Sequence, residues 1–275
     1  MDGLIKYCKS EHNIQGSCNT IQLGTFDYYR EMNPKFSIAD AKEGFIHYKV
    51  SEDIDVTAEQ YNAFLGSAVA IKGPGIMEQQ KHPGGSKIRM QGGGVVFDGE
   101  KTKATVGAGS EVELYYPNSY MFCSSIYSNG DEKEPKIVSE EYDSYYQIDR
   151  NSINSFATSI ATLLEQQLNL GDFKIENQLK SESVNHLRSG FKVTWIARPV
   201  EYIQEKEIYL KSKEDFDLNK YYEIYFDSMF KKGIDYASDM EFRILFFVQS
   251  PTLGIQSMNK SPKILELNPI KQHLK

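Results

Sequence analysis

The segment that most constrains the fold is Met240–Val248, MEFRILFFV, a run of apolar and aromatic residues near the end of the chain. Its length suits a strand and falls well short of a membrane span. Side chains two residues apart share a face of a strand, so Asp239, Glu241 and Arg243 are expected to point one way. The apolar residues between them would point the other way. The segment therefore predicts a strand that enters the core with one apolar and one charged face.

The clearest helix is predicted over Asn151–Asn169, where apolar side chains recur with a period of 3.6 residues. They are Ile153, Phe156, Ile160, Leu163, Leu164 and Leu168. Asn151 or Ser152 is expected to cap the start of this helix, and Gly171 to stop it. A second helix is predicted within Glu214–Lys231, which begins with acidic residues and continues with aromatic ones.

Short strand-like segments separated by turn residues occupy much of the remaining chain. They are Leu4–Cys8, Ile14–Leu23, Gly44–Val50, Leu114–Tyr127, Tyr145–Asp149, Phe191–Ile196 and Val200–Ile203. A short helix is expected to begin at Thr57. Strands mixed with a few helices predict an α+β fold. A chain of 275 residues suits one large domain with an insertion.

The expected insertion is the glycine-dense region from about residue 66 to 109. Pairs and triplets of glycine alternate there with the β-like pieces AVAIK, SKIRM and GVVFDG, which predict hairpins. The region is locally basic inside an acidic protein. Its candidates for contacting a negatively charged partner are Lys72, Lys81, Lys87 and Arg89.

Charge and cysteine content limit the classes of function. The net charge of −7 argues against a non-specific nucleic-acid binder, although an enzyme could still meet nucleic acid through a local basic loop. The three cysteines are scattered and form no C-x-x-C pair, which favours unpaired thiols in a reducing cytoplasm. The N-terminus has no apolar stretch like a signal peptide, so we expect a cytoplasmic protein without a membrane anchor.

The familiar catalytic and metal-binding motifs do not occur in the chain. The five histidines have no metal-ligand spacing, and no metal site is predicted. The glycine stretches match neither GxxxxGK nor a GxGxxG that follows a strand. There is no GxSxG or Cys–His pattern for acyl transfer.

A candidate ligand-binding segment is IQLGTFDYYREMNPKFSIADAKEG, near the N-terminus. Its arginine, Arg30, can hold a phosphate or carboxylate through two hydrogen bonds, and Tyr28 and Tyr29 can stack on a flat ring. Asp40 and Glu43 are three residues apart and share a face if the segment is helical. The alternative is that these two acids simply cap a helix that starts near residue 38.

The second candidate is the charged face of the C-terminal strand. Glu241 beside Arg243 could orient a nucleophile or stabilise a developing positive charge. The alternative is a half-exposed strand whose charged face carries an ordinary salt bridge.

Short stretches at the two ends of the chain, together with a block near residue 40, resemble a bacterial domain family related to the DarT-type ADP-ribosyltransferases. LIKYC resembles the family's N-terminal K-Y strand, with Lys6 and Tyr7 on that pair. IADAKEG resembles its F-N-D-P-F-E block, with Asp40 on the D and Glu43 on the E. Here A-D-A replaces N-D-P.

YASDMEFRILF resembles the family's C-terminal E-x-E-x-R strand. Asp239 falls on the first acid, Glu241 on the second and Arg243 on the arginine, so the first glutamate is replaced by an aspartate. The segment YMFCSSIY lies where the family has a core strand that ends in a small polar turn. The glycine-rich region has no counterpart in this resemblance.

The resemblance implies an ADP-ribosyltransferase-like fold, with two small antiparallel sheets that form a cleft and helices outside it. It makes Glu241 the catalytic residue and NAD the co-substrate. Arg30 would bind the NAD diphosphate and Tyr28 or Tyr29 would line the nicotinamide, in a site that also includes Lys6, Tyr7, Asp40 and Arg243. These assignments remain expectations here.

The implied function is that of a toxin or anti-phage effector that transfers ADP-ribose to nucleic acid or protein. The basic glycine-rich insertion would contact the acceptor, and a dedicated antitoxin or inhibitor protein would suit such a toxin. The main alternative is a non-catalytic, β-rich binding or assembly protein with the same polar strand face. A nuclease-type effector is a third interpretation, which the lack of a metal-ligand pattern weakens.

Overall fold

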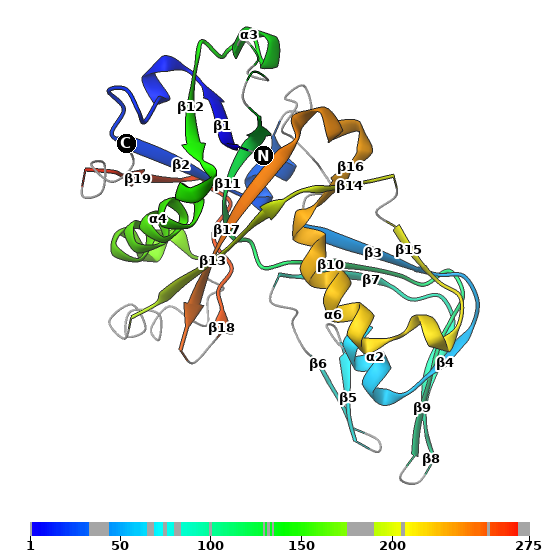
Figure 1. Cartoon of the computed structure of the whole chain (residues 1–275). Coiled ribbons are helices and arrows are strands. Elements are labelled where there is room, and N and C mark those ends of the chain that lie inside the picture. The colour runs from blue at the N-terminus through cyan, green and yellow to red at the C-terminus, as the bar shows by residue number, and fades with distance from the viewer. Residues whose placement is uncertain are drawn as a thin grey trace. The chain divides into compact units, whose positions relative to one another are not determined.

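The computed structural model describes residues 2–32, 44–64, 69–73, 76–79, 84–98, 101–128, 130, 133, 135–174, 190–204, 207–251 and 254–268. The fold is mixed α+β and rich in strands, as predicted (Figure 1). The chain divides into two compact units. Unit 1 comprises Met1–Ala41, Asn118–Tyr202 and Ile234–Lys275, and unit 2 comprises Lys42–Pro117 and Ile203–Gly233. The expected single domain over residues 1–275 stays a prediction.

Unit 1 is built on an antiparallel sheet with the strand order β12-β1-β11-β17-β13. These strands are Ser144–Asp149, Gly3–Cys8, Tyr120–Tyr127, Glu241–Ser250 and Lys192–Pro199, in that order. Three further strands extend the sheet: β2 (Thr20–Thr25) pairs with β11, β19 (Lys263–Glu266) with β2, and β18 (Gly254–Ile255) with β17. The strands predicted at Leu4–Cys8, Tyr145–Asp149 and Met240–Val248 are therefore confirmed, although the last begins at Glu241.

Helix α4 (Ile153–Gln167) covers one face of this sheet (Figure 1). Its apolar side packs into a hydrophobic core, to which β17 contributes Phe242, Ile244 and Phe246. The helix follows the predicted period but ends at Gln167 rather than near Gly171. The reason is local, because the Asn169 side chain caps a separate short turn over Leu170–Asp172.

Unit 1 contains further helical turns. They are α1 (Phe26–Glu31), α3 (Pro135–Val138) and the 3-10 turns Ser10–His12, Arg150–Ser152, Leu170–Asp172 and Ile234–Asp239. The strand expected at Ile14–Leu23 begins only at Thr20. Before it the Asn13 side chain accepts a hydrogen bond from the Gln15 N–H at 2.9 Å, which holds this segment in a turn.

The charged end of β17 differs from the prediction. Asp239 ends a 3-10 turn, and Met240 has a left-handed backbone with φ 46°. The strand therefore begins at Glu241, and the two-residue alternation does not extend back to Asp239. From Glu241 to Val248 every residue is buried, so both faces of this part of the strand lie inside the protein rather than half exposed.

Unit 2 contains a sheet with the order β15-β3-β10-β7, in which β15 runs parallel to β3 and the other neighbours are antiparallel. These strands are Glu207–Leu210, Phe45–Val50, Glu111–Tyr115 and Ser86–Arg89. A second sheet joins β4 (Ile54–Val56), β9 (Lys101–Val106) and β8 (Gly93–Asp98), and a hairpin joins β5 (Val69–Gly73) to β6 (Ile76–Gln79). The hairpins expected in the glycine-dense region are confirmed.

The helices of unit 2 are α2 (Ala58–Phe64) and α6 (Leu218–Asp227). Short elements complete the description: 3-10 turns at Lys213–Asp215 and Ser228–Phe230, β16 at Lys231–Gly233, and β14 at Glu201–Ile203 on the boundary between units. Helix α2 begins after Thr57, as predicted. The backbone N–H of Gln60 donates to the Thr57 hydroxyl at 3.2 Å, and the Thr57 N–H donates to the Gln60 side chain at 3.0 Å.

One predicted strand proves to be two. The segment Leu114–Tyr127 contains the end of β10 in unit 2 and all of β11 in unit 1. Residues 116–119 separate them without regular structure. The expected turn at Pro117 and Asn118 is thus the point where the chain passes from one unit to the other. None of the described helices is long and apolar enough to cross a membrane.

Candidate functional site

Two charged side chains lie at the start of β17, on the face of the sheet that α4 does not cover. The Nε of Arg243 donates to Oε1 of Glu241 at 2.6 Å. Both side chains are buried. A buried ion pair is electrostatically strong, but removing one member leaves the other charge buried without that partner. The prediction that Glu241 and Arg243 share a face of the strand is therefore confirmed. The structure adds that the two side chains form a buried ion pair.

The neighbouring strands surround this pair with polar side chains. On β11, Ser125 is directly opposite Glu241 and Cys123 is opposite Arg243. On β13, Arg198 is opposite Arg243. Residues opposite one another on antiparallel strands point to the same side of the sheet. The register therefore gathers a thiol, a hydroxyl, a carboxylate and two guanidinium groups on one face.

The backbone at Glu241 is held by two contacts from residues that follow β13. The N–H of Glu241 donates to the Tyr202 hydroxyl at 2.7 Å, and the Val200 N–H donates to the Glu241 carbonyl at 2.9 Å. The Met240 carbonyl accepts from the Ile126 N–H of β11 at 2.8 Å. These contacts fix the position where the 3-10 turn changes into the strand.

Tyr29 of α1 joins this group from the N-terminal part of the chain. The Thr25 hydroxyl caps α1 by accepting from the Tyr28 N–H at 3.1 Å. The Tyr29 ring is buried, and burial raises the pKa of its hydroxyl well above the usual value. A hydrogen bond to the Cys123 side chain and the charge of Glu241 raise it further. The two predicted halves of the site, at Tyr29 and Glu241, thus lie within electrostatic reach of each other.

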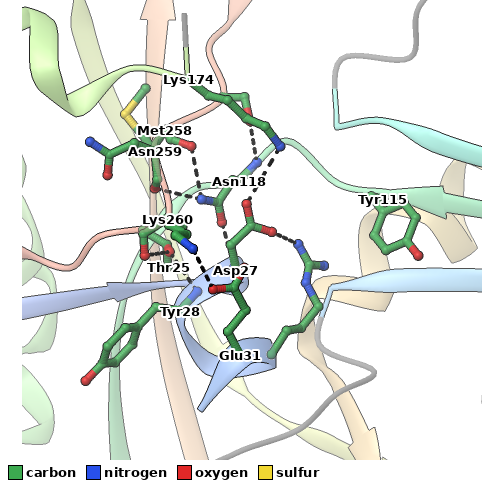
Figure 2. Close-up of polar contacts among 12 residues, drawn as sticks. Thr25, Asp27, Tyr28, Glu31, Tyr115, Asn118, Lys174, Met258, Asn259 and Lys260 are labelled. Carbon is green, nitrogen blue, oxygen red and sulfur yellow. Dashed lines mark hydrogen bonds and ion pairs between the residues drawn. The ribbon is translucent and has the colours of Figure 1, made fainter.

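Tyr28 and Arg30 lie beside Tyr29 on the same short helix. The rings of Tyr28 and Tyr29 meet edge to face, with their centroids 5.3 Å apart. Arg30 forms an ion pair with Asp27 one turn earlier. The Lys174 Nζ is 3.8 Å from the second oxygen of Asp27 (Figure 2). Two cationic side chains therefore meet at one carboxylate next to the tyrosines.

Asn118 holds the start of α1 in place. Its side-chain oxygen accepts from the Asp27 N–H at 2.9 Å, and its amide nitrogen donates to the carbonyls of Met258 at 3.0 Å and Asn259 at 2.8 Å (Figure 2). Asn118 is itself buried, so these contacts replace the water that an amide needs. The sequence interpretation placed only a turn here and missed this role.

Lys6 and Tyr7, the expected K-Y pair, point to opposite faces of β1. The Lys6 Nζ donates to the Cys123 carbonyl at 2.7 Å and lies 5.6 Å from the centre of the Phe122 ring, on the α4 side. Tyr7 packs on the other face, and its hydroxyl accepts from the Lys133 N–H at 3.0 Å. The sheet therefore separates the Lys6 side chain from Glu241.

The remaining expected site residues fall elsewhere. Asp40, Glu43 and Lys81 lie outside the described residues. In unit 2 Lys72 is exposed on β5. Lys87 forms an ion pair with Glu113 at 3.3 Å, and Arg89 is directly opposite Glu111 on β10. The positive charges of Lys87 and Arg89 thus face two acids of the adjacent strand, Glu113 and Glu111.

Three features were not singled out as site residues from the sequence: Cys123, Tyr202 and Asn118. For Cys123 a signal existed, because it belongs to the predicted strand YMFCSSIY and alternates with Ser125. Tyr202 and Asn118 act through contacts with residues far along the chain, so no local pattern marks them. Among the described residues, no group of three or more His, Cys, Asp or Glu side chains could hold a metal ion.

Comparison with protein-family models, with curated proteins and with solved structures found no match to this chain. The interpretation of the site therefore depends on the arrangement of its own residues. The most informative arrangement is the electrostatic proximity of Tyr29, near the N-terminus, to Glu241, which is paired with Arg243 on the C-terminal strand.

Proposed function

We propose that this chain is an NAD-dependent ADP-ribosyltransferase with Glu241 as its catalytic residue. The observation that supports the proposal is the proximity of Tyr29 and Glu241, which lie far apart in sequence. They belong to the two segments in which the sequence pattern predicts cofactor binding and catalysis. A binding segment and a catalytic strand of one enzyme must share a site, because one substrate has to touch both.

The chemistry suits a carboxylate held by an arginine. Breaking the bond between nicotinamide and ribose builds positive charge on the ribose, and a fixed carboxylate stabilises that charge. Arg243 donates its Nε–H to Glu241 Oε1 at 2.6 Å and fixes the orientation of the carboxylate. The strand that carries both residues is buried between neighbours, which restricts movement of the pair.

The cofactor contacts in this proposal come from α1. Arg30 would bind the diphosphate, since its present partner, the Asp27 carboxylate, is an anion of similar geometry. Lys174 adds a second positive charge at the same carboxylate. Tyr28, half buried, would offer an aromatic surface to the nicotinamide.

The acceptor in this proposal is a nucleic acid or a protein. Contacts through the basic residues of the glycine-dense region remain part of the proposal, as does an antitoxin or inhibitor protein. These residues are Lys72, Lys81, Lys87 and Arg89. The product would be an ADP-ribosylated acceptor and free nicotinamide, in the manner of a toxin or defence effector.

The test is to incubate the purified chain with NAD labelled on the adenylate part, with and without cell extract. Nicotinamide release and label transfer are then measured. Glu241→Gln should lower both by about a hundredfold or more, as expected when a group that stabilises transition-state charge is removed. A fully active Glu241→Gln variant, or wild-type protein that never consumes NAD, would rule the proposal out.

A matched control is Asp172→Asn. Asp172 is also buried and forms an ion pair with Lys263 at 2.6 Å in unit 1. This variant loses one buried carboxylate, as Glu241→Gln does, but at a structural position. Activity per folded molecule should be retained in Asp172→Asn, which separates loss of chemistry from loss of folding.

A second candidate, a non-catalytic binding or assembly protein, is favoured by one observation. The charged groups of the site already pair within the protein, Glu241 with Arg243 and Arg30 with Asp27. Such pairs also serve to hold a fold together. Calorimetric binding of NAD without any nicotinamide release would favour this alternative over the transferase.

A further inference from the structure

The position of Tyr29 differs from that of a residue that stacks on a ligand ring. Its ring is buried and lies against Gly24 of β2. A Cβ atom at position 24 would lie 2.5 Å from Cε2 and 2.6 Å from the hydroxyl oxygen of Tyr29. Only glycine leaves room for the ring here, because two heavy atoms cannot approach so closely. The tip of the side chain is therefore confined by the sheet.

The confined hydroxyl is directed toward the charged pair. Gly24 is opposite Met121 on β11, and Cys123 is two residues further along the same face. The Tyr29 hydroxyl shares a hydrogen bond with the Cys123 side chain. Cys123 in turn is opposite Arg243, whose guanidinium binds Glu241. Neighbouring side chains on one face of the sheet thus lead from the N-terminal helix to the carboxylate.

We propose that Tyr29 is a positioning residue whose hydroxyl, acting through Cys123, holds the Arg243–Glu241 pair in its orientation on β17. Tyr28, whose ring is less buried, then remains the aromatic surface for the cofactor. The catalytic consequence rests on the proposed transferase function. The coupling between Tyr29 and Glu241 does not, since it concerns only contacts within unit 1.

Two substitutions disturb the Tyr29 hydroxyl in different ways. Tyr29→Phe keeps the ring and removes only the hydroxyl. Gly24→Ala keeps the tyrosine but forces its ring to move. The matched control is Tyr146→Phe, which also removes a buried hydroxyl, from β12 in the core beneath α4.

For NAD turnover, the expected result is a kcat lowered about tenfold in Tyr29→Phe, because the carboxylate is no longer held in its productive orientation. The KM for NAD should stay within about twofold, since Tyr29 itself does not contact the cofactor in this proposal. Gly24→Ala should lower kcat similarly, and Tyr146→Phe should not. A rise in KM with unchanged kcat in Tyr29→Phe would overturn the proposal and restore Tyr29 as a cofactor-contacting residue.

A second measurement needs no activity. Hydrogen exchange of the β17 amides in moderate urea reports how readily this strand opens. Tyr29→Phe, Glu241→Gln and the double variant form a double-mutant cycle. Each variant is described by the factor by which its protection against exchange falls. In the double variant we expect this factor to be at least threefold smaller than the product of the factors in the two single variants. In the control cycle of Tyr146→Phe with Glu241→Gln, the loss of protection in the double variant should equal the product of the two single losses within error.

The two measurements separate the two proposals. Wild-type protein without NAD turnover, together with a coupled Tyr29–Glu241 cycle, would refute the transferase and keep the positioning contact. The opposite outcome is NAD turnover by the wild type, an unchanged kcat in Tyr29→Phe, and no coupling between Tyr29 and Glu241 in the cycle. That outcome would refute the positioning contact and keep the transferase.

Discussion

Arg243 and Glu241 lie two residues apart on β17 and form an ion pair of 2.6 Å, although both side chains are buried. Removing two charges from water is unfavourable by several kcal/mol for each ion, and the attraction between them only partly offsets this. The pair is therefore a weak source of stability but a strong constraint, because the loss of either member leaves a buried charge without this partner.

Arg243→Leu should destabilise the protein by about 3–5 kcal/mol, since it leaves the Glu241 carboxylate buried without its cation. Adding Glu241→Gln to this variant should recover part of the loss, because the uncompensated charge is then removed as well. Urea denaturation of the single and double variants measures both effects. A loss below about 1 kcal/mol in Arg243→Leu would mean that the carboxylate is compensated by other groups.

Asn118→Ala should destabilise unit 1 by roughly 3 kcal/mol, because three backbone groups, one buried and two partly buried, lose their hydrogen-bond partner. Asn118→Asp keeps the shape but turns a carboxylate oxygen toward the carbonyls of Met258 and Asn259, so a larger loss is expected. Hydrogen exchange of the Asp27 amide reports the contact directly. Equal exchange in wild type and Asn118→Ala would contradict this role.

Gly3→Ala should destabilise the sheet by about 1–3 kcal/mol. A Cβ at Gly3 would collide with the Ile148 carbonyl oxygen on β12 and lie 2.8 Å from Cε1 of Tyr127 on β11. Gly94→Ala is the matched control, since a Cβ at this strand glycine meets nothing within 4 Å. That substitution should be neutral or stabilise the protein by up to about 1 kcal/mol. Similar losses in both variants, measured by thermal denaturation, would refute the steric explanation.

The buried thiol of Cys8 predicts a pH dependence. Burial raises the pKa of Cys8 from 9.0 to about 11. A group whose pKa is raised on folding adds stability at pH below its unfolded pKa, and this contribution is lost as pH rises through the folded pKa. The Cys8 contribution should therefore be complete below about pH 9 and disappear between pH 9 and 11.

Alkylation followed by mass spectrometry measures the Cys8 thiolate. Its rate in the folded protein should rise about tenfold per pH unit from pH 8 up to about 11, because the thiolate is the reactive form. In denaturing urea the rate should level off nearer pH 9. Identical profiles for folded and unfolded protein would contradict the raised pKa.

Local patterns predicted much of the secondary structure. The apolar period of α4, the capping residues at Thr57 and the apolar run of β17 all depend on residues close together in sequence. The end of α4 was misplaced, because the Asn169 side chain caps a separate turn there. Asp239 was wrongly placed on the strand, since the left-handed Met240 interrupts the alternation.

For the candidate site, the sequence by itself determined that Glu241 and Arg243 share a face, because alternation along a strand is a local property. Only the tertiary structure decided that both are buried, that Cys123 faces Arg243, and that Tyr29 is directed toward them. It also decided that Lys6 lies on the opposite face. The physical reason is that strand order and register arise from contacts between distant segments, and no pattern within one segment specifies its neighbours.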